Sequence, residues 1–68
     1  MFKIELTRVL GWDSPAVAAL QTMEPYLCDA EKLARQWLKG YQEENPESGA
    51  SAYRILDTRG RGLKASTL

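Results

Sequence analysis

Histidine is absent from this 68-residue sequence, and cysteine occurs once, at Cys28. Histidine is the commonest general base and metal ligand in enzymes, so its absence excludes most familiar catalytic and metal sites. A single cysteine excludes an internal disulfide and a cysteine-based zinc site within one chain. We therefore expect a non-enzymatic protein without catalytic residues, cofactor or metal, whose stability comes from packing.

A surplus of charge is also missing, because nine basic and nine acidic side chains cancel. This balance removes the global electrostatic argument for binding nucleic acid or an anionic membrane. Long apolar runs are lacking, and charged residues interrupt the first apolar segment, so we expect neither a signal peptide nor a membrane span. These features favour a cytoplasmic protein.

The overall composition is that of one small globular domain. Hydrophobic residues make up 44% of the chain and charged residues 26%, near the averages for folded proteins. A chain of this length buries only about 60% of the surface that its unfolded form exposes. We expect residues 1–68 to form a single domain of modest stability, and no repeat or motif specific to one family is visible.

Two segments near the N-terminus suggest strands. Residues 2–10 alternate between apolar and polar side chains, and residues 11–15 then introduce a turn because they include glycine and proline. Residues 16–23 are ambiguous, since Ser14 followed by Pro15 resembles a helix start, whereas a turn after a strand favours a hairpin partner. We favour the strand and keep the short helix as the alternative.

The clearest periodic signal lies at residues 29–43. Apolar residues recur there at helical spacing, and charged or polar residues fill the opposite face. Asp29 is placed to cap the first turn, and Asn45-Pro46 stops the helix soon after Glu43. The apolar stripe consists of Ala30, Leu33, Ala34, Trp37, Leu38 and Tyr41.

A polar loop separates this helix from a second hairpin-like region. Residues 52–56 alternate again, and Asp57 and Gly60 are the preferred first and last residues of a type I turn. Residues 61–64 fit a short returning strand at the sheet edge. We expect residues 64–68 to be a frayed tail.

This order of elements predicts an α+β fold. We expect a small, mostly antiparallel sheet of three to four strands, with one amphipathic helix (about 29–43) packed on one face. The larger stripe residues must find shelter on that sheet, because an isolated helix of this length is not stable. The expected sheet contacts are Phe2, Ile4, Leu6 and the residues around Ile55.

Cationic side chains dominate the C-terminal region, where Asp57 is the single acid among four basic residues. Arginine binds phosphate in a bidentate manner, and Gly60 and Gly62 permit close backbone approach, so a basic hairpin fits nucleic acid. Charged, glycine-containing turns are nevertheless ordinary in soluble hairpins. The basic residues are Arg54, Arg59, Arg61 and Lys64.

Trp12 and Cys28 are the other two side chains that suggest chemistry. Trp12 lies in a turn, where it either stays exposed as an interface anchor or folds back over the helix to close the core. Cys28 precedes the expected helix, where the helix dipole favours a reactive thiolate. Packing of Cys28 against Leu33 is the reading we favour, because no histidine is present to activate the thiol.

The sequence therefore favours a non-catalytic protein-interaction module. It would bind a protein partner or another copy of itself through the uncovered sheet face or an edge strand near residues 61–64. The alternative is a small nucleic-acid-binding protein that uses the basic C-terminal hairpin, and an enzyme with Cys28 as nucleophile is the third reading. The candidate partner-binding residues are Trp12, Arg54, Arg59, Arg61 and Lys64.

Overall fold

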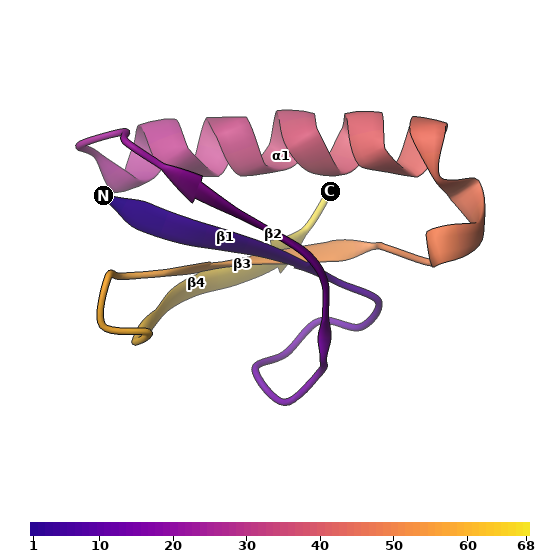
Figure 1. The fold of residues 1–68 in the computed structure, drawn as a ribbon, viewed down its shortest axis with the longest axis horizontal. Coiled ribbons are helices and arrows are strands. Elements are labelled where there is room, and N and C mark those ends of the chain that lie inside the picture. The colour runs from indigo at the N-terminus through magenta and orange to yellow at the C-terminus, as the bar shows by residue number, and fades with distance from the viewer.

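A computed structural model describes residues 1–68 as a four-stranded antiparallel sheet with one long helix on one face (Figure 1). The strand order is β2-β1-β3-β4, so β2 and β4 are the two edges of the sheet. This confirms the predicted α+β class. The elements in chain order are β1 (Phe2–Thr7), β2 (Ala16–Thr22), α1 (Leu27–Glu44), the 3-10 helix η1 (Pro46–Ser48), β3 (Ala52–Leu56) and β4 (Gly62–Thr67).

The pairing register assigns each strand residue to one of two faces. Ile4 of β1 lies opposite Leu20 of β2 and Ile55 of β3, and opposed residues of antiparallel strands point to the same face. These three residues point to the side that α1 covers, which we name the helix face. Glu5 and Arg54 form the next pair and point to the other side, the far face.

The core lies between α1 and the two central strands. Ala30, Ala34 and Leu38 form the fully buried row of the helix, because the small alanines let α1 approach the sheet closely. The predicted packing of the apolar stripe on the sheet is confirmed, although Leu33 and Trp37 are only partly buried at its margin. The buried core consists of Ile4, Leu6, Ala30, Ala34, Leu38, Ala50, Tyr53 and Ile55.

Residues 16–22 form strand β2, so the favoured reading of this segment is confirmed. Its five residues from Ala18 to Thr22 pair in register with β1, and the register shifts between Leu6 and Thr7. The first strand ends at Thr7 rather than at residue 10, because the chain leaves the ladder there to form the connecting loop.

The frayed tail expected at 64–68 is wrong for most of its length. Strand β4 continues to Thr67, with Ser66 opposite Tyr53 and Thr67 opposite Ala52. The expected strand at 61–64 was therefore too short, because β3 offers backbone partners along its whole length and the chain follows them. The turn that joins the two strands is confirmed, and Gly60 N donates to Asp57 O at 3.0 Å.

The helix begins two residues before its expected start. Tyr26 occupies the N-cap position without a side-chain capping hydrogen bond, and Asp29 lies in the first turn instead. The backbone N–H of Ala30 donates to Tyr26 O at 3.1 Å, which closes this first turn. The capping role expected for Asp29 is therefore wrong.

Candidate interaction surfaces

Arg54 joins the far face of the sheet to the loop between β1 and β2. Its Nε donates to Glu5 Oε1 at 2.6 Å, and its Nη1 donates to the carbonyls of Gly11, Trp12 and Ser14 at 3.3, 3.1 and 2.7 Å. Arg54 is 8% exposed. Its donors are therefore already engaged within the fold, which argues against the predicted partner-binding role of Arg54.

Trp12 rests on β4 rather than on the helix. A Cβ atom built at Gly62 would lie 2.6 Å from Cζ3 of the Trp12 ring, so glycine is needed for the ring to lie this close. The loop hangs on the side of the sheet opposite α1 (Figure 1). The expectation that Trp12 closes the core over the helix is wrong, whereas its partial exposure, 48%, agrees with the other reading.

The loop that Arg54 holds presents a small apolar surface. Val9 and Leu10 are 64% and 53% exposed, and together with Trp12 they form what we name the loop surface. The N-terminal end of the loop is fixed by Arg8, whose Nε donates to Ser48 O at 2.9 Å. The loop surface is therefore held from both ends, which lowers the entropy that a contact through it would cost.

The four basic side chains of the C-terminal region do not form one patch. Lys64 points to the helix face and binds Glu31 at 2.6 Å, whereas Arg54 lies on the far face. Arg61 Nε lies 3.3 Å from Asp57 Oδ2 in the turn, and Arg59 is exposed without an ion pair. Three of the four cations are thus paired with carboxylates.

These ion pairs shift the protonation of their members. Hydrogen bonds from Lys64 and Tyr53 lower the pKa of Glu31, and the same carboxylate raises the pKa of Lys64. Backbone hydrogen bonds from Arg61 and Arg59 lower the pKa of Asp57. These carboxylates are therefore held in the ionised form, in which they already accept hydrogen bonds from the fold.

Glu5 shows two opposing effects on its pKa. Burial of its carboxylate raises the pKa, but the hydrogen bonds and charges of Arg54 and Lys3 outweigh burial, so the pKa lies below its ordinary value. Glu5 is 14% exposed and Lys3 Nζ lies 3.3 Å from its Oε2. Glu5 is thus the acidic partner that allows Arg54 to be buried.

A second apolar surface was not predicted from the sequence, and it lies where β2 runs into α1. Met23 and Tyr26 are 78% and 67% exposed, and Leu20 and Leu27 are each 37% exposed. Met23, Tyr26 and Leu27 are close to the end of β2 because only four residues join β2 to α1. We name Leu20, Met23, Tyr26 and Leu27, with the free backbone edge of β2, the β2 surface.

The helix covers β2 less than it covers the two central strands. It packs against β1 and β3, and its Glu31 and Gln42 turn toward the β3 side, where they contact Tyr53 and the Ala50 carbonyl. Trp37 lies six residues after Glu31, about 120° around the helix, and therefore faces the β2 side. Of the helix-face side chains of β2, Thr22 is buried and Ala18 packs against the core, whereas Leu20 stays 37% exposed.

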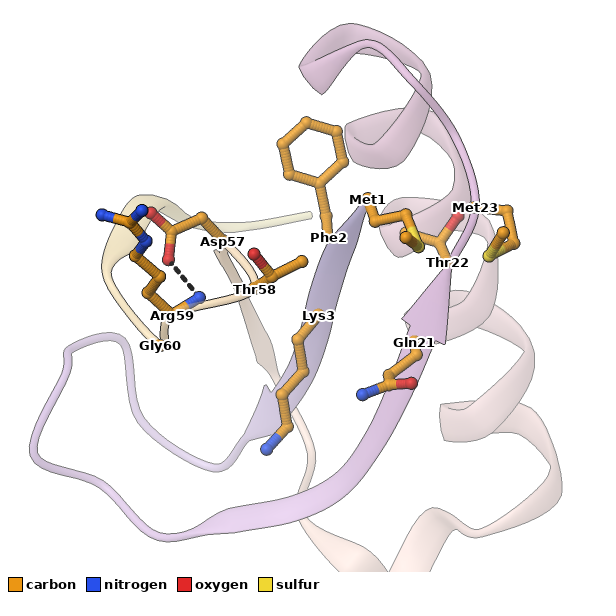
Figure 2. Close-up of a pocket in the computed structure, with 10 residues that line it drawn as sticks. All are labelled: Met1, Phe2, Lys3, Gln21, Thr22, Met23, Asp57, Thr58, Arg59 and Gly60. Atoms are coloured by element: carbon orange, nitrogen blue, oxygen red, sulfur yellow. Dashed lines mark hydrogen bonds between the residues drawn. The ribbon is translucent and has the colours of Figure 1, made fainter.

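A shallow hollow lies at the end of the sheet where β1 begins (Figure 2). Its volume is about 550 Å³, and its wall includes Met1, Met23 and the turn between β3 and β4. The carboxylate of Asp57 in this wall accepts from Arg59 N and Arg61 N at 2.9 and 2.8 Å, so it is occupied by the turn itself. Met23 of the β2 surface and Met1 line this hollow together.

Cys28 lies in the first turn of α1 and is exposed. The expected packing of Cys28 against Leu33 is wrong, because Cys28 is exposed whereas Leu33 packs against the core. The structure has no cluster of three or more metal-ligating side chains. Its long helix, α1, also lacks the apolar length that a membrane span needs.

No protein-family model, curated protein or solved structure matches this chain.

Proposed function

We propose that this protein is a non-catalytic protein-interaction module that binds an extended segment of a partner along the free edge of β2. The supporting observation is that β2 is an uncharged strand whose outer backbone edge is free. Outward backbone N–H and C=O groups of an edge strand have no partner within their own sheet, and an added strand supplies one. Main-chain hydrogen bonds then provide affinity, and the alternating side chains provide selectivity.

The two sheet edges differ in how they are protected. Natural edge strands discourage strand addition with charged side chains, prolines or covering loops. The β4 edge has Lys64 on one face and the Trp12 ring against Gly62 on the other. The β2 edge has neither, since its sequence from Ala16 to Thr22 contains no charged residue and no proline.

The exposed apolar side chains beside β2 also support the proposal. Interfaces are anchored by large apolar and aromatic side chains near the centre of the contact. Tyr26 and Met23 provide such side chains at one end of β2, and Leu20 provides one in its middle. A strand added to β2 would therefore gain apolar contacts in addition to its backbone hydrogen bonds.

The basic hairpin supports nucleic-acid binding less than its sequence suggests. Phosphate binding needs free cations on one surface, whereas Arg54, Arg61 and Lys64 each engage a carboxylate of this chain. We therefore retain protein binding as the proposed function.

Selection of peptides from a random phage-displayed library against the immobilised protein tests this proposal. We expect the enriched peptides to alternate apolar and polar residues, as a strand on β2 requires. Their affinity should fall about tenfold or more in the Leu20→Lys variant, because a charge on the helix face of β2 would be trapped beside the added strand.

Leu63→Lys is the matched control for Leu20→Lys. Leu63 lies in the other edge strand, β4, and is 41% exposed, against 37% for Leu20. The selected peptides should bind Leu63→Lys as tightly as the unmodified protein. Peptides that bind Leu20→Lys without loss, or that lose affinity only for Leu63→Lys, would refute the assignment of the binding edge.

A further inference from the structure

We infer that the strand bound by β2 is the β2 strand of a second copy, so that two chains form one continuous eight-stranded antiparallel sheet around a two-fold axis. This inference rests on the proposed function, because it names the partner of the same edge. Two-fold homodimers are the commonest oligomers, and in them one self-complementary patch meets itself. The β2 edge could form such a patch, because it is a free sheet edge without charged residues.

Symmetry restricts the register of this pairing. A two-fold axis perpendicular to the sheet keeps the helix face of both copies on the same side, and opposed residues share a face. Some residue must therefore lie opposite its own copy at the axis. The regular part of β2 runs from Ala18 to Thr22, and pairing all of it places the axis at Leu20.

The charge pattern of the edge favours a second copy. A charged residue near a two-fold axis faces a like charge, which is unfavourable. Around Leu20 every β2 side chain is uncharged, so antiparallel self-pairing brings no like charges together. Self-pairing of β4 about its middle would instead place Lys64 within two positions of its own copy.

The proposed pairing also buries the side chains that the monomer leaves open. Leu20 is 37% exposed on the helix face, and at the axis it would contact Leu20 of the second copy. Met23 and Val17 flank the two ends of this regular stretch, so they would come together at each end of the pairing. The apolar margin of each helix, formed by Leu33 and Trp37, would then face the same newly formed strip of sheet.

Sedimentation equilibrium over a range of protein concentrations, under reducing conditions, tests the inference. We expect a monomer-dimer equilibrium for the unmodified protein and for Leu63→Lys. In Leu20→Lys two ammonium groups would face each other at the axis, so the dissociation constant should rise about tenfold or more. A protein that stays monomeric throughout would overturn the inference.

A cysteine placed at the proposed axis provides a second measurement that does not depend on the charged variant. In a Cys28→Ser background, Leu20→Cys places two thiols at directly opposed positions, whose Cβ atoms lie about 4.5 to 5.5 Å apart in antiparallel strands. We expect rapid formation of a covalent dimer on mild oxidation. Leu63→Cys in the same background should stay largely reduced.

The two experiments separate failure of the dimer from failure of the proposed function. Selected peptides that bind at β2 while the protein stays monomeric would leave the proposed function standing and overturn the second copy as its occupant. Equal cross-linking of Leu20→Cys and Leu63→Cys would show that any association does not use the β2 edge. Loss of peptide binding at β2 would overturn both.

Discussion

Arg54 shows how the environment of one residue changes its role. In the sequence it belongs to a run of basic residues that suggests an exposed, phosphate-binding hairpin. In the structure it is buried, paired with Glu5, and hydrogen-bonded to three carbonyls of the β1–β2 loop. A buried guanidinium is stable only when its donors are satisfied in this way.

Replacement of Arg54 by alanine should destabilise the protein strongly. The change removes the buried partner of Glu5, which keeps only the partly exposed Lys3 beside it, and frees the loop carbonyls. The loss of one member of a buried pair costs about 3 kcal/mol or more. Urea unfolding measures this loss, and limited proteolysis should show faster cleavage in the loop at residues 11–14. Arg59→Ala, at an exposed position, should change stability by less than about 0.5 kcal/mol.

The Glu5–Arg54 pair also predicts how stability depends on pH. The pKa of Glu5 is lower in the folded state than its ordinary value, so its contribution is complete above the unfolded value of about 4.3 and is lost as the pH falls through the folded value. Glu31 and Asp57 act in the same direction. Stability should therefore fall as the pH is lowered below about 5.

Urea unfolding of Glu5→Gln between pH 7 and pH 3 isolates the part of the pH dependence of stability that is due to Glu5. The variant should be less stable at pH 7 and should lose less stability than the unmodified protein on acidification. Parallel pH profiles for the two proteins would show that Glu5 is not the responsible group.

The elements β2 and α1 differ in how local sequence and tertiary contacts determine them. The alanine-rich segment 16–22 has a local preference for helix, yet it forms a strand because β1 offers it a ladder of backbone partners. The helix α1 follows from its own periodicity, but its start does not, since Tyr26 provides no capping side chain. A capping side chain at position 26 would therefore raise the free energy of unfolding.

Replacement of Tyr26 by aspartate should stabilise the protein. An aspartate at the N-cap accepts a hydrogen bond from a free N–H of the first turn and is worth about 1 kcal/mol, and its charge also suits the helix dipole. Urea unfolding at low protein concentration measures the gain. Tyr26→Ala is the control, since it removes the ring without adding a cap, and equal stability of the two variants would argue against capping.

At the scale of the whole molecule, one helix is too narrow to cover four strands. The helix α1 lies mainly over β1 and β3, so Leu20 of β2 stays 37% exposed, while the same face of β4 is occupied by the Lys64–Glu31 ion pair. The uneven cover produces one protected and one unprotected edge. The proposed dimer would resolve this asymmetry by joining the two unprotected edges.

Thermal unfolding should therefore depend on protein concentration. Dimer formation stabilises the folded state by mass action, so Tm should rise by about 3 °C for each tenfold increase in concentration once the dimer predominates. Scanning calorimetry or circular dichroism measures this shift. In Leu20→Lys the rise of Tm should begin only at about tenfold or more higher concentration, and a constant Tm for the unmodified protein would contradict the dimer.

The sequence by itself determined the α+β class, the helix with its apolar stripe and the turn at Asp57, because these depend on periodicity and turn residues that are local, whereas residues 16–22 became a strand through their pairing with β1. The length of β4, the burial of Arg54 and the position of Trp12 on Gly62 were decided only by the tertiary structure. Each of them depends on a partner more than forty residues away or on a neighbouring strand, and a local pattern does not encode such partners. The β2 surface was likewise decided by the tertiary structure. Which strand forms a free edge is known only once the strand order and the position of the helix on the sheet are known.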